Sequence, residues 1–418
     1  MPVRSSGSLI LAAALALALS SCKREPERGA PIDAGAPPPL PASSPARAAS
    51  AGAPTSSAPG GAFTDPDPLP DAERRSLPGL IAFISERDGA PTVYLLRPSG
   101  EDQRRLTQRS AAQYPAASTP DGASLLLVSV EEDHENKLHL EQLVVQPLDG
   151  GPGKAVGPRG GRNRSPSASP DGRWIVFESD VESFSDIYRV NRDGTGLQRL
   201  TRNREGNFEP ALSPDGTQIA FVSSRDGDPE LYRMRADGTG QQRLTAFHRE
   251  DWAPRCSPDG KRLAFVSNRE TRERVYVMDA DGTHLRALTT PPGEAAAPAA
   301  PPAADAGASP RLLDESEPAW SPDGKRIAYI TRGGGTKARI WVAEVTTGVT
   351  RGLTADTHSS EGPVWSPDGR YLAFVSSRAG DTELYVMRAD GTGQTRVTQS
   401  KGADWLPRWI SPGRGAGR

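Results

Sequence analysis

The stretch Pro363-Val364-Trp365-Ser366-Pro367-Asp368-Gly369 decides the fold, and an apolar run, Tyr-Leu-Ala-Phe-Val at residues 371–375, follows it. Proline presets φ for a turn, aspartate can accept a hydrogen bond from the backbone two residues later, and glycine tolerates positive φ. The stretch therefore predicts a strand, a tight turn and a second, apolar strand.

The same turn recurs along the chain. Its Asp-Gly pairs lie at residues 121–122, 171–172, 215–216, 259–260, 323–324 and 368–369. Successive pairs are 50, 44, 44, 64 and 45 residues apart, and the longest interval contains a Pro/Ala-rich insert at 291–310. A period of this length with four short strands is typical of a β-propeller with one blade per repeat. We therefore expect an all-β fold, a single β-propeller of four-stranded blades.

The apolar second strands indicate the number of blades. They begin at residues 81, 125, 175, 219, 263, 327 and 372, which predicts seven blades. Six blades are the alternative, if the irregular second repeat packs differently. The first repeat, from Leu80, lacks the proline-containing strand, and residues 404–410 supply such a strand with no second strand after it. We expect this strand to join the first blade, because closure removes the exposed edges of an open array.

The N-terminal region predicts export. Arg4 precedes an apolar run at residues 9–19, which is too short for a membrane span of about 20 residues. Residues 1–21 are therefore predicted to be a signal peptide. The sequence Leu-Ser-Ser-Cys at 19–22 is similar to a bacterial lipobox, which implies lipidation of Cys22. An ordinary secretory signal is the alternative.

The rest of the chain divides by composition. Residues 22–76 are rich in Ala, Pro and Ser without hydrophobic periodicity, so we expect a disordered tether. The propeller is expected to span 77–413, with 291–310 as a disordered insert and 414–418 as a tail. The net charge of −2 gives no basic footprint, so we expect no nucleic-acid partner.

The repeated phrase Pro-x-Trp-Ser-Pro-Asp-Gly-x-x-Ile-Ala-Phe resembles the propeller repeats of the TolB family, which are also described as WD-repeat-like. Trp320 and Trp365 keep its tryptophan, and the resemblance covers residues 80–413. It implies a bacterial envelope setting, where TolB contacts a peptidoglycan-associated lipoprotein through one propeller face. TolB also has an α/β domain before its propeller and no lipid anchor. We therefore expect a TolB-like lipoprotein, anchored in the outer membrane and facing the periplasm.

Several chemically suggestive side chains have a structural explanation. Each turn aspartate is expected to bond its own backbone. Cys256 stands where other repeats have tryptophan or leucine, which predicts a buried apolar residue rather than a reactive thiol. Asp226, Asp228 and Glu230 lack the full pattern of an EF-hand and are expected in a solvated loop. We expect no metal, no cofactor and no catalytic residue.

An enzyme is the alternative. His248 and His358 precede first strands and could reach the central mouth. TolB-like propellers include metal-assisted pectin lyases that use histidine there, so the resemblance also allows an enzyme acting on polysaccharide or peptide at this mouth. The chain has no Gly-x-Ser-x-Gly nucleophile elbow. Convergence of the two histidines with acidic residues would favour the enzyme.

The best binding candidates lie where the repeats disagree. These positions precede the proline of each repeat, at one mouth of the channel, and mix aromatic with charged side chains. The candidates are Arg164, Phe208, Glu209, Asp251, Trp252, Glu317, Glu361, Asp404 and Trp405. Aromatic anchors with a polar rim suit a protein or glycan ligand. We therefore expect a non-catalytic, monomeric scaffold that binds an envelope protein or a peptidoglycan-associated component.

Overall fold

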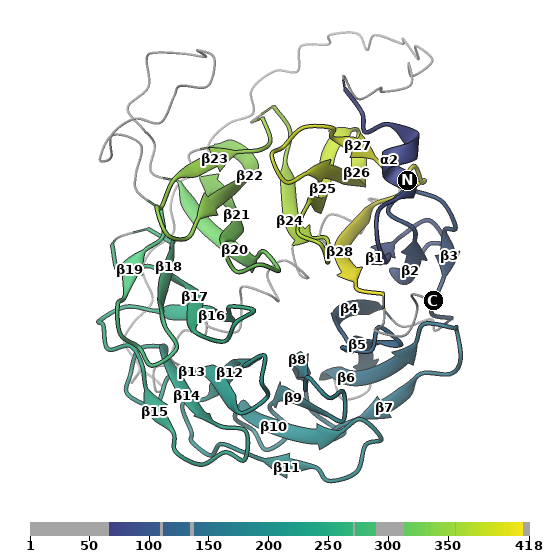
Figure 1. Ribbon diagram of the computed structural model, residues 1–418. Coiled ribbons are helices and arrows are strands. Elements are labelled where there is room, and N and C mark those ends of the chain that lie inside the picture. The colour runs from purple at the N-terminus through teal and green to yellow at the C-terminus, as the bar shows by residue number, and fades with distance from the viewer. Residues whose placement is uncertain are drawn as a thin grey trace, which may run out of the picture. The chain divides into compact units, whose positions relative to one another are not determined.

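The computed structural model describes residues 67–108, 112–133, 138–270, 272–289, 313–333, 335–355 and 357–412. Its strands form seven sheets of four strands, arranged around a common axis as Figure 1 shows. The predicted all-β propeller and its seven blades are confirmed. Blade 1 consists of β28, β1, β2 and β3, and blades 2 to 7 take β4 to β27 in groups of four.

Each blade runs from an innermost strand to the rim. The innermost strands are β28 (Asp404–Ile410), β4 (Gln113–Ser118), β8 (Asn163–Ala168), β12 (Asn207–Leu212), β16 (Asp251–Cys256), β20 (Asp314–Trp320) and β24 (Ser360–Trp365). The second strands are β1 (Leu80–Ser85), β5 (Ser124–Asp133), β9 (Trp174–Ser179), β13 (Gln218–Ser223), β17 (Arg262–Ser267), β21 (Arg326–Gly333) and β25 (Tyr371–Ala379). The third strands are β2 (Thr92–Leu96), β6 (Leu138–Pro147), β10 (Asp186–Asn191), β14 (Glu230–Arg235), β18 (Arg274–Asp279), β22 (Thr336–Glu344) and β26 (Asp381–Arg388). The outermost strands are β3 (Arg104–Arg105), β7 (Lys154–Val156), β11 (Gln198–Arg199), β15 (Gln242–Arg243), β19 (Arg286–Ala287), β23 (Thr350–Gly352) and β27 (Thr395–Arg396).

The C-terminal strand closes the ring. β28 pairs antiparallel with β1 from Leu80↔Ile410 to Ser85↔Asp404, and Figure 1 shows the two strands side by side. The predicted closure of the first blade is therefore confirmed. It pairs the inner edge of β1, which an open array would leave exposed.

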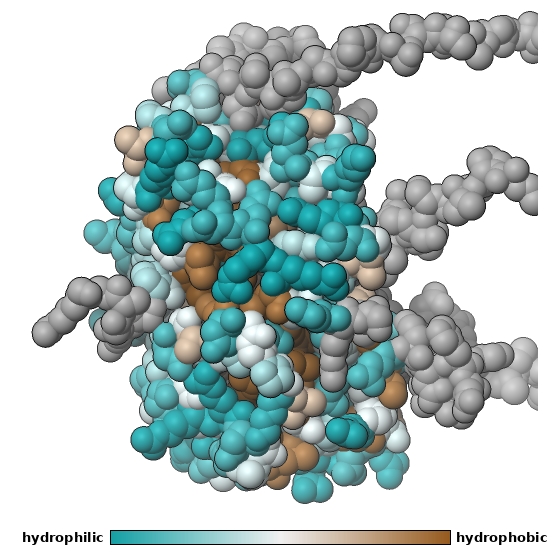
Figure 2. All heavy atoms as spheres, turned by 90° about the vertical axis from the view of Figure 1, so that its right-hand side faces the viewer, coloured by the Kyte–Doolittle hydropathy of each residue, from teal (hydrophilic) through white to brown (hydrophobic). Residues whose placement is uncertain are grey.

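The core lies between the blades. The second strands are buried on both faces because each sheet packs against two neighbours. In blade 4, for example, Phe221 is fully buried and its ring centroid lies 5.7 Å from that of Tyr232 on the third strand. Figure 2, which views the side of blade 1, shows hydrophilic residues over most of this face and hydrophobic residues between them.

The Asp-Gly turns connect the first and second strands and are structural. In blade 4, Oδ1 of Asp215 accepts hydrogen bonds from the Ser213 hydroxyl at 2.5 Å and from the Thr217 backbone N–H at 3.0 Å. The backbone N–H of Gln218 in turn donates to the Ser213 hydroxyl at 2.9 Å. Gly216 has φ of +72°, and a Cβ there would lie 2.9 Å from Pro170 of the preceding turn. The expectation that the turn aspartates bond their own backbone is confirmed.

The packed region begins earlier than residue 77. Helix α2 (Asp71–Arg75) lies within the predicted tether, yet Leu69 is buried, and Glu73 accepts hydrogen bonds from Tyr371 at 2.9 Å and Arg388 at 2.8 Å. Residues 67–76 are therefore part of the propeller, because they cover blade 7.

The other predictions on domain organisation concern residues that the structure does not describe. The predicted signal peptide, Cys22, tether residues 22–66, the insert at 291–310 and the tail at 414–418 lie outside the described residues. Within the described part of the chain, no helix is both long enough and apolar enough to cross a membrane.

Candidate binding site at the channel mouth

The innermost strands share a bulge at the residue before their proline. In six blades this residue has φ between 49° and 62°: Ser165, Glu209, Ala253, Glu317, Gly362 and Leu406. The pairing register with the second strand shifts at the same place. Proline is tolerated here because the free edge of an innermost strand needs no N–H donor. The bulge takes the residue before the proline out of the hydrogen-bond ladder. The N–H and the side chain of that residue can then reach a neighbouring blade.

Glutamates use these released N–H groups to join adjacent blades. Oε2 of Glu178 accepts the backbone N–H of Glu209 at 2.6 Å, and Oε2 of Glu209 accepts that of Ala253 at 2.6 Å. Between blades 6 and 7, Oε2 of Glu317 accepts the backbone N–H of Gly362 at 3.1 Å. Glu209 thus stabilises the propeller in addition to lying at the mouth.

A cluster of acidic residues, which we call the glutamate cluster (Glu141, Glu178 and Glu209), is centred on Glu178 and includes the charge of Arg164. The Arg164 guanidinium binds both carboxylate oxygens of Glu141, with Nη2 at 2.9 Å from Oε1. Glu178 stands opposite Arg164 in the register between β8 and β9. Two carboxylates, those of Glu141 and Glu178, therefore face one guanidinium, and the carboxylate of Glu209 acts on Glu178 from blade 4.

This arrangement changes the acidity of Glu178. The pKa of Glu178 is raised to about 7, chiefly by burial; the Glu209 backbone N–H and Arg164 oppose the rise, and the carboxylates of Glu209 and Glu141 add to it. Burial and Glu141 likewise raise the pKa of Tyr114. A buried carboxyl group whose pKa is raised toward neutrality is a candidate functional group.

A second charged group lies between blades 6 and 7. Nη2 of Arg332 bridges Oε2 of Glu361 at 2.8 Å and Oε1 of Glu317 at 3.4 Å. The three side chains keep 27%, 23% and 27% of their surface exposed. Burial raises the pKa of Glu317, Arg332 lowers it, and Glu361 raises it again. We call this group the mouth ion-pair network (Glu317, Arg332 and Glu361).

Arginines follow the proline in two blades. Burial and the positive charge of Arg255 lower the pKa of Arg408 to about 10, so Arg408 is still charged at neutral pH. Nε of Arg408 donates to the carbonyl oxygen of Ala116 at 3.2 Å. The innermost strands therefore carry both signs of charge.

The structure divides the nine predicted binding residues. Five of them, Arg164, Phe208, Glu209, Glu317 and Glu361, lie at or beside the bulges, and all but the buried Glu209 are partly exposed.

The other four, Asp251, Trp252, Asp404 and Trp405, are buried, at 7% exposure or less. They cannot touch a partner unless the blades open, so their assignment to an open mouth is corrected.

The buried residues belong to a structural network. Asp251 accepts two hydrogen bonds from Arg269, at 2.8 and 3.0 Å, and Asp404 pairs with Arg87 at 3.0 Å. The Arg269 guanidinium also stacks on the Tyr276 ring, 4.5 Å from its centroid. An arginine just after the second strand thus joins the start of the innermost strand to the core.

The sequence reasoning did not select Glu141, Glu178 or Arg332. For Glu178 a signal existed: residues 175–179 read Ile-Val-Phe-Glu-Ser, whereas blades 4 and 5 have valine at the fourth position, at Val222 and Val266. A glutamate at a position where other blades have a buried valine indicates that the side chain has a polar partner instead of an apolar contact.

The histidines are not brought together. His248 and His358 are exposed and precede β16 and β24, with blade 6 between them. Glu230 does not lie in the solvated loop expected for it: it is buried at the start of β14 and accepts the Thr245 hydroxyl at 2.5 Å. Among the residues that the structure describes, no group of three or more His, Cys, Asp or Glu side chains is arranged to hold a metal ion.

Comparison with known proteins gives one family match and several partial likenesses. The family model described as the TolB beta propeller domain matches residues 135–303 and 307–415. An uncharacterized protein of Agrobacterium fabrum is 30% identical over 132 residues, which is 31% of this chain and 43% of that protein. The uncharacterized peptidase YuxL of Bacillus subtilis is 33% identical over 154 residues, which is 29% of this chain and 22% of the peptidase. The chain thus spans less than half the length of either relative.

A solved structure shows the same fold. An oligogalacturonate lyase in complex with manganese aligns over 77% of this chain and 86% of its own, with a TM-score of 0.56 and 16% identity. At this identity the likeness concerns the fold alone.

Proposed function

Because the chain belongs to the TolB beta propeller family, we propose that it is a non-catalytic cell-envelope scaffold that binds a partner protein or a cell-wall component at its channel mouth. In this proposal Cys22 carries the lipid anchor, which attaches the protein to the outer membrane on its periplasmic side, and the protein acts as a monomer. The tether would hold the propeller away from the lipid surface.

The mouth ion-pair network is the observation that supports this proposal most. Its three side chains are about three-quarters buried yet still exposed to solvent, so a ligand can exchange hydrogen bonds with them. Arg332 is shared between two carboxylates, and a cationic or amide group of a partner could take over one of them. Partly desolvated charges of this kind favour specific recognition over general adhesion.

Phe208 supplies the apolar part of the mouth. Its ring packs against Gly206, where an added Cβ would lie 2.3 Å from a ring carbon, and the side chain is still partly exposed. Held aromatic side chains make good anchors because they bury a large area at little entropy cost. Phe208 on blade 4 and Glu361 on blade 7 would contact a partner that spans the mouth.

Site-specific cross-linking tests the proposal. A photoreactive benzoyl-phenylalanine is placed at Phe208 and, as the control, at Leu197, an exposed residue at the turn end of blade 3. In envelope extracts of the source bacterium, we expect a discrete cross-linked partner at the first position only, and its loss when Glu361→Arg is added. Equal cross-linking at both positions, or none at Phe208, would rule out the mouth as the interface.

The alternative is an enzyme acting on polysaccharide or peptide at the same mouth. The raised pKa of Glu178, to about 7, favours it, because a general acid or base works best near the operating pH. Against it, Glu178 is 3% exposed and already accepts a backbone hydrogen bond. Turnover of oligogalacturonate with added Mn²⁺, or of peptides, that disappears in Glu178→Gln would establish this reading.

The membrane anchor has its own test. We expect metabolic labelling with a radioactive fatty acid to mark the wild-type protein and to fail in Cys22→Ser, and the labelled protein to fractionate with the outer membrane. Labelling that persists in Cys22→Ser would show that Cys22 is not the lipidated residue.

A further inference from the structure

Tryptophan rings fill three of the spaces between neighbouring blades, at the turn ends of the innermost strands. Between blades 5 and 6, the indole of Trp320 donates its N–H to the carbonyl oxygen of Arg255 at 2.9 Å and lies under the Arg262 guanidinium, 5.3 Å from it. Between blades 6 and 7, Trp365 makes the same bond to Ala319 at 2.9 Å and lies 4.7 Å from Arg326. We call each such space an interblade slot.

The slot between blades 3 and 4 holds an indole from the opposite wall. Trp174, at the start of β9, packs in the same core cluster as Leu212 at the end of β12. The Arg189 guanidinium stacks on Trp174 at 4.1 Å and donates to the carbonyl oxygen of Ala236 at 3.4 Å. Three slots therefore share one arrangement, an indole against a guanidinium.

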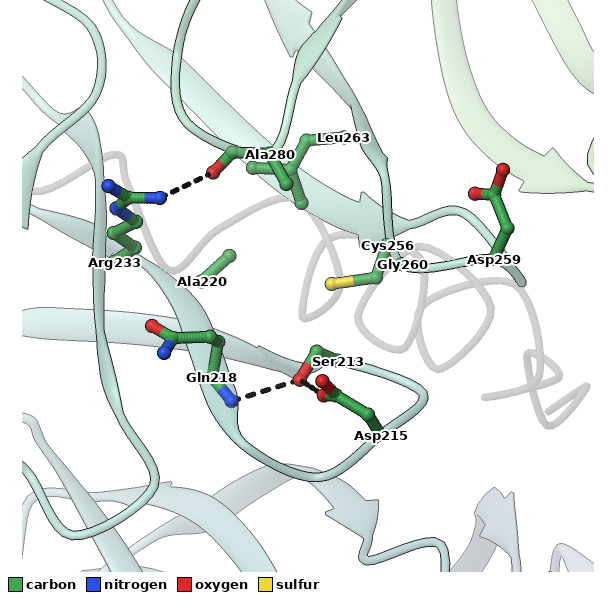
Figure 3. Close-up of a pocket in the computed structure, with 10 residues that line it drawn as sticks. All are labelled: Ser213, Asp215, Gln218, Ala220, Arg233, Cys256, Asp259, Gly260, Leu263 and Ala280. Carbon is green, nitrogen blue, oxygen red and sulfur yellow. Dashed lines mark hydrogen bonds between the residues drawn. The ribbon is translucent and has the colours of Figure 1, made fainter.

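The slot between blades 4 and 5 has no tryptophan at either of the two positions that supply one in the other slots. Gln218 stands where blade 3 has Trp174, and Cys256 stands where blade 6 has Trp320. The Cys256 thiol points to the carbonyl oxygen of Ala211 at 3.7 Å, the acceptor that corresponds to the one Trp320 uses. The side chain is too short to fill the slot, and a cavity of about 150 Å³ remains, which Figure 3 shows with its lining residues.

The chemistry of this cavity suits a ring. Ala220 and Leu263, buried at 4% and 3% exposure, form its apolar part, and exposed residues of the two adjoining turns form its rim. Arg233 lines one wall and donates to the carbonyl oxygen of Ala280 at 3.4 Å, in the same way as Arg189 donates to Ala236. A guanidinium is therefore held where the neighbouring slot has one stacked on an indole, and a ring placed beside it would gain a cation–π contact.

The cysteine does not add reactivity to the site. Burial raises the pKa of Cys256 to about 12, so the group is a neutral thiol at physiological pH and a poor nucleophile. The structure corrects the prediction that Cys256 is a buried apolar residue, because its side chain is only partly buried. What distinguishes the slot is the missing volume beside the thiol.

We propose that this slot binds the tryptophan side chain of a partner protein. The ring would stack on Arg233 and donate its N–H to the carbonyl oxygen of Ala211, as the indoles of Trp320 and Trp365 do in their slots. A cavity of about 150 Å³ in another protein is large enough to bind benzene, and this one is open at its rim. The occupant comes from outside the chain, because all seven tryptophans lie in the described blades and none fills this slot. The site is independent of the mouth, since it lies at the other end of the innermost strands.

Fluorine NMR of 5-fluoroindole tests the proposal with the full chain. We expect saturable binding that N-acetyl-tryptophanamide displaces. In Cys256→Trp, where the protein's own indole fills the slot, binding should weaken by about tenfold or more. Arg233→Met keeps the slot open without its charge and should weaken binding less.

A matched variant extends the test. Trp320→Cys creates a second slot between blades 5 and 6, beside Arg262, and should add a second equivalent of bound 5-fluoroindole. No saturable binding to the wild type, or equal binding to Cys256→Trp, would overturn the proposal. Binding of 5-fluoroindole that N-acetyl-tryptophanamide cannot displace would also overturn it, because a tryptophan in a peptide would then not fit.

Discussion

Oε2 of Glu178 lies 2.6 Å from the backbone nitrogen of Glu209, so a glutamate on the second strand of blade 3 holds the bulge on the innermost strand of blade 4. The backbone N–H of Glu209 has left the hydrogen-bond ladder of its sheet and therefore needs another acceptor. The Glu178 carboxylate is that acceptor. Glu178 is nevertheless almost fully buried near two other carboxylates, and this conflict makes its protonation state matter for the stability of the whole propeller.

The stability of the protein should fall as the pH rises through the titration of Glu178. The pKa of Glu178 is about 7 in the folded protein and 4.5 in a free glutamate. Between these values the folded state keeps a proton that the unfolded state has lost, so the free energy of unfolding decreases with increasing pH. Glu178→Gln removes this dependence while keeping an oxygen acceptor. We expect its free energy of unfolding, relative to wild type, to rise by on the order of 3 kcal/mol between pH 5 and pH 8.

Urea unfolding at the two pH values measures this difference. Glu205→Gln is the control, because Glu205 is exposed on the same face and should shift neither curve relative to wild type. A constant difference between Glu178→Gln and wild type from pH 5 to pH 8 would contradict the prediction.

Removal of the buried carboxylate of Asp251 should cost far more than removal of one at the mouth. Asp251→Ala leaves the Arg269 guanidinium buried at 10% side-chain exposure without its partner, which typically costs about 3 to 5 kcal/mol. Glu361→Ala leaves Arg332 with Glu317 and partly in water, and should cost less than about 1 kcal/mol. Chemical denaturation of both variants tests the assignment of Asp251 to the fold and of Glu361 to the surface. Similar losses for the two would contradict it.

Deletion of the closing strand should abolish cooperative folding. A chain that stops at residue 403 loses β28 and exposes the inner edge of β1, which is then free to pair with other molecules. We expect aggregation and the loss of a sharp thermal transition in circular dichroism. A chain that stops at residue 412 keeps β28 and should melt like the wild type. A soluble, cooperatively melting 1–403 chain would show that closure is dispensable.

Each Asp-Gly turn should contribute modestly to stability. Asp215→Ala removes acceptors for the Ser213 hydroxyl and the Thr217 N–H and should lower the free energy of unfolding by about 1 kcal/mol. Asp228→Ala, in an exposed loop of the same blade, is the matched control and should change it by less than about 0.5 kcal/mol. Thermal or urea unfolding measures both. Equal effects would mean that the turn aspartate acts only through its charge.

The fold was predictable because its signals are local. A proline, an aspartate and a glycine within seven residues define each turn, and the apolar second strand follows at once, so both can be recognised without knowledge of contacts. The start of the packed region could not be recognised in this way. Helix α2 has only five residues, and Glu73 is held by Tyr371 and Arg388, which lie 298 and 315 residues later.

The mouth was only partly predictable because burial there depends on distant partners. Asp251 lies three residues before its repeat proline and Glu361 lies two before its own, and both carry a carboxylate. Arg269 pairs with Asp251 inside the blade, whereas Arg332 leaves Glu361 near solvent. The residue types alone do not show which of the two carboxylates is buried. The break in an apolar phrase at Glu178 was the one local sign of the glutamate cluster.

The sequence by itself determined the all-β propeller, its seven blades and its closure by the C-terminal strand, because turn residues and strand periodicity act over a few residues and repeat. Only the tertiary structure decided which polar side chains are available to a ligand. It placed Glu178 against the backbone of the next blade, buried Asp251 under an arginine, and left a ring-sized space beside Cys256. The first and the third depend on how one blade packs against its neighbour, and the second depends on an ion pair within one blade. Such contacts join residues that are not adjacent in the chain, so the local sequence does not specify them.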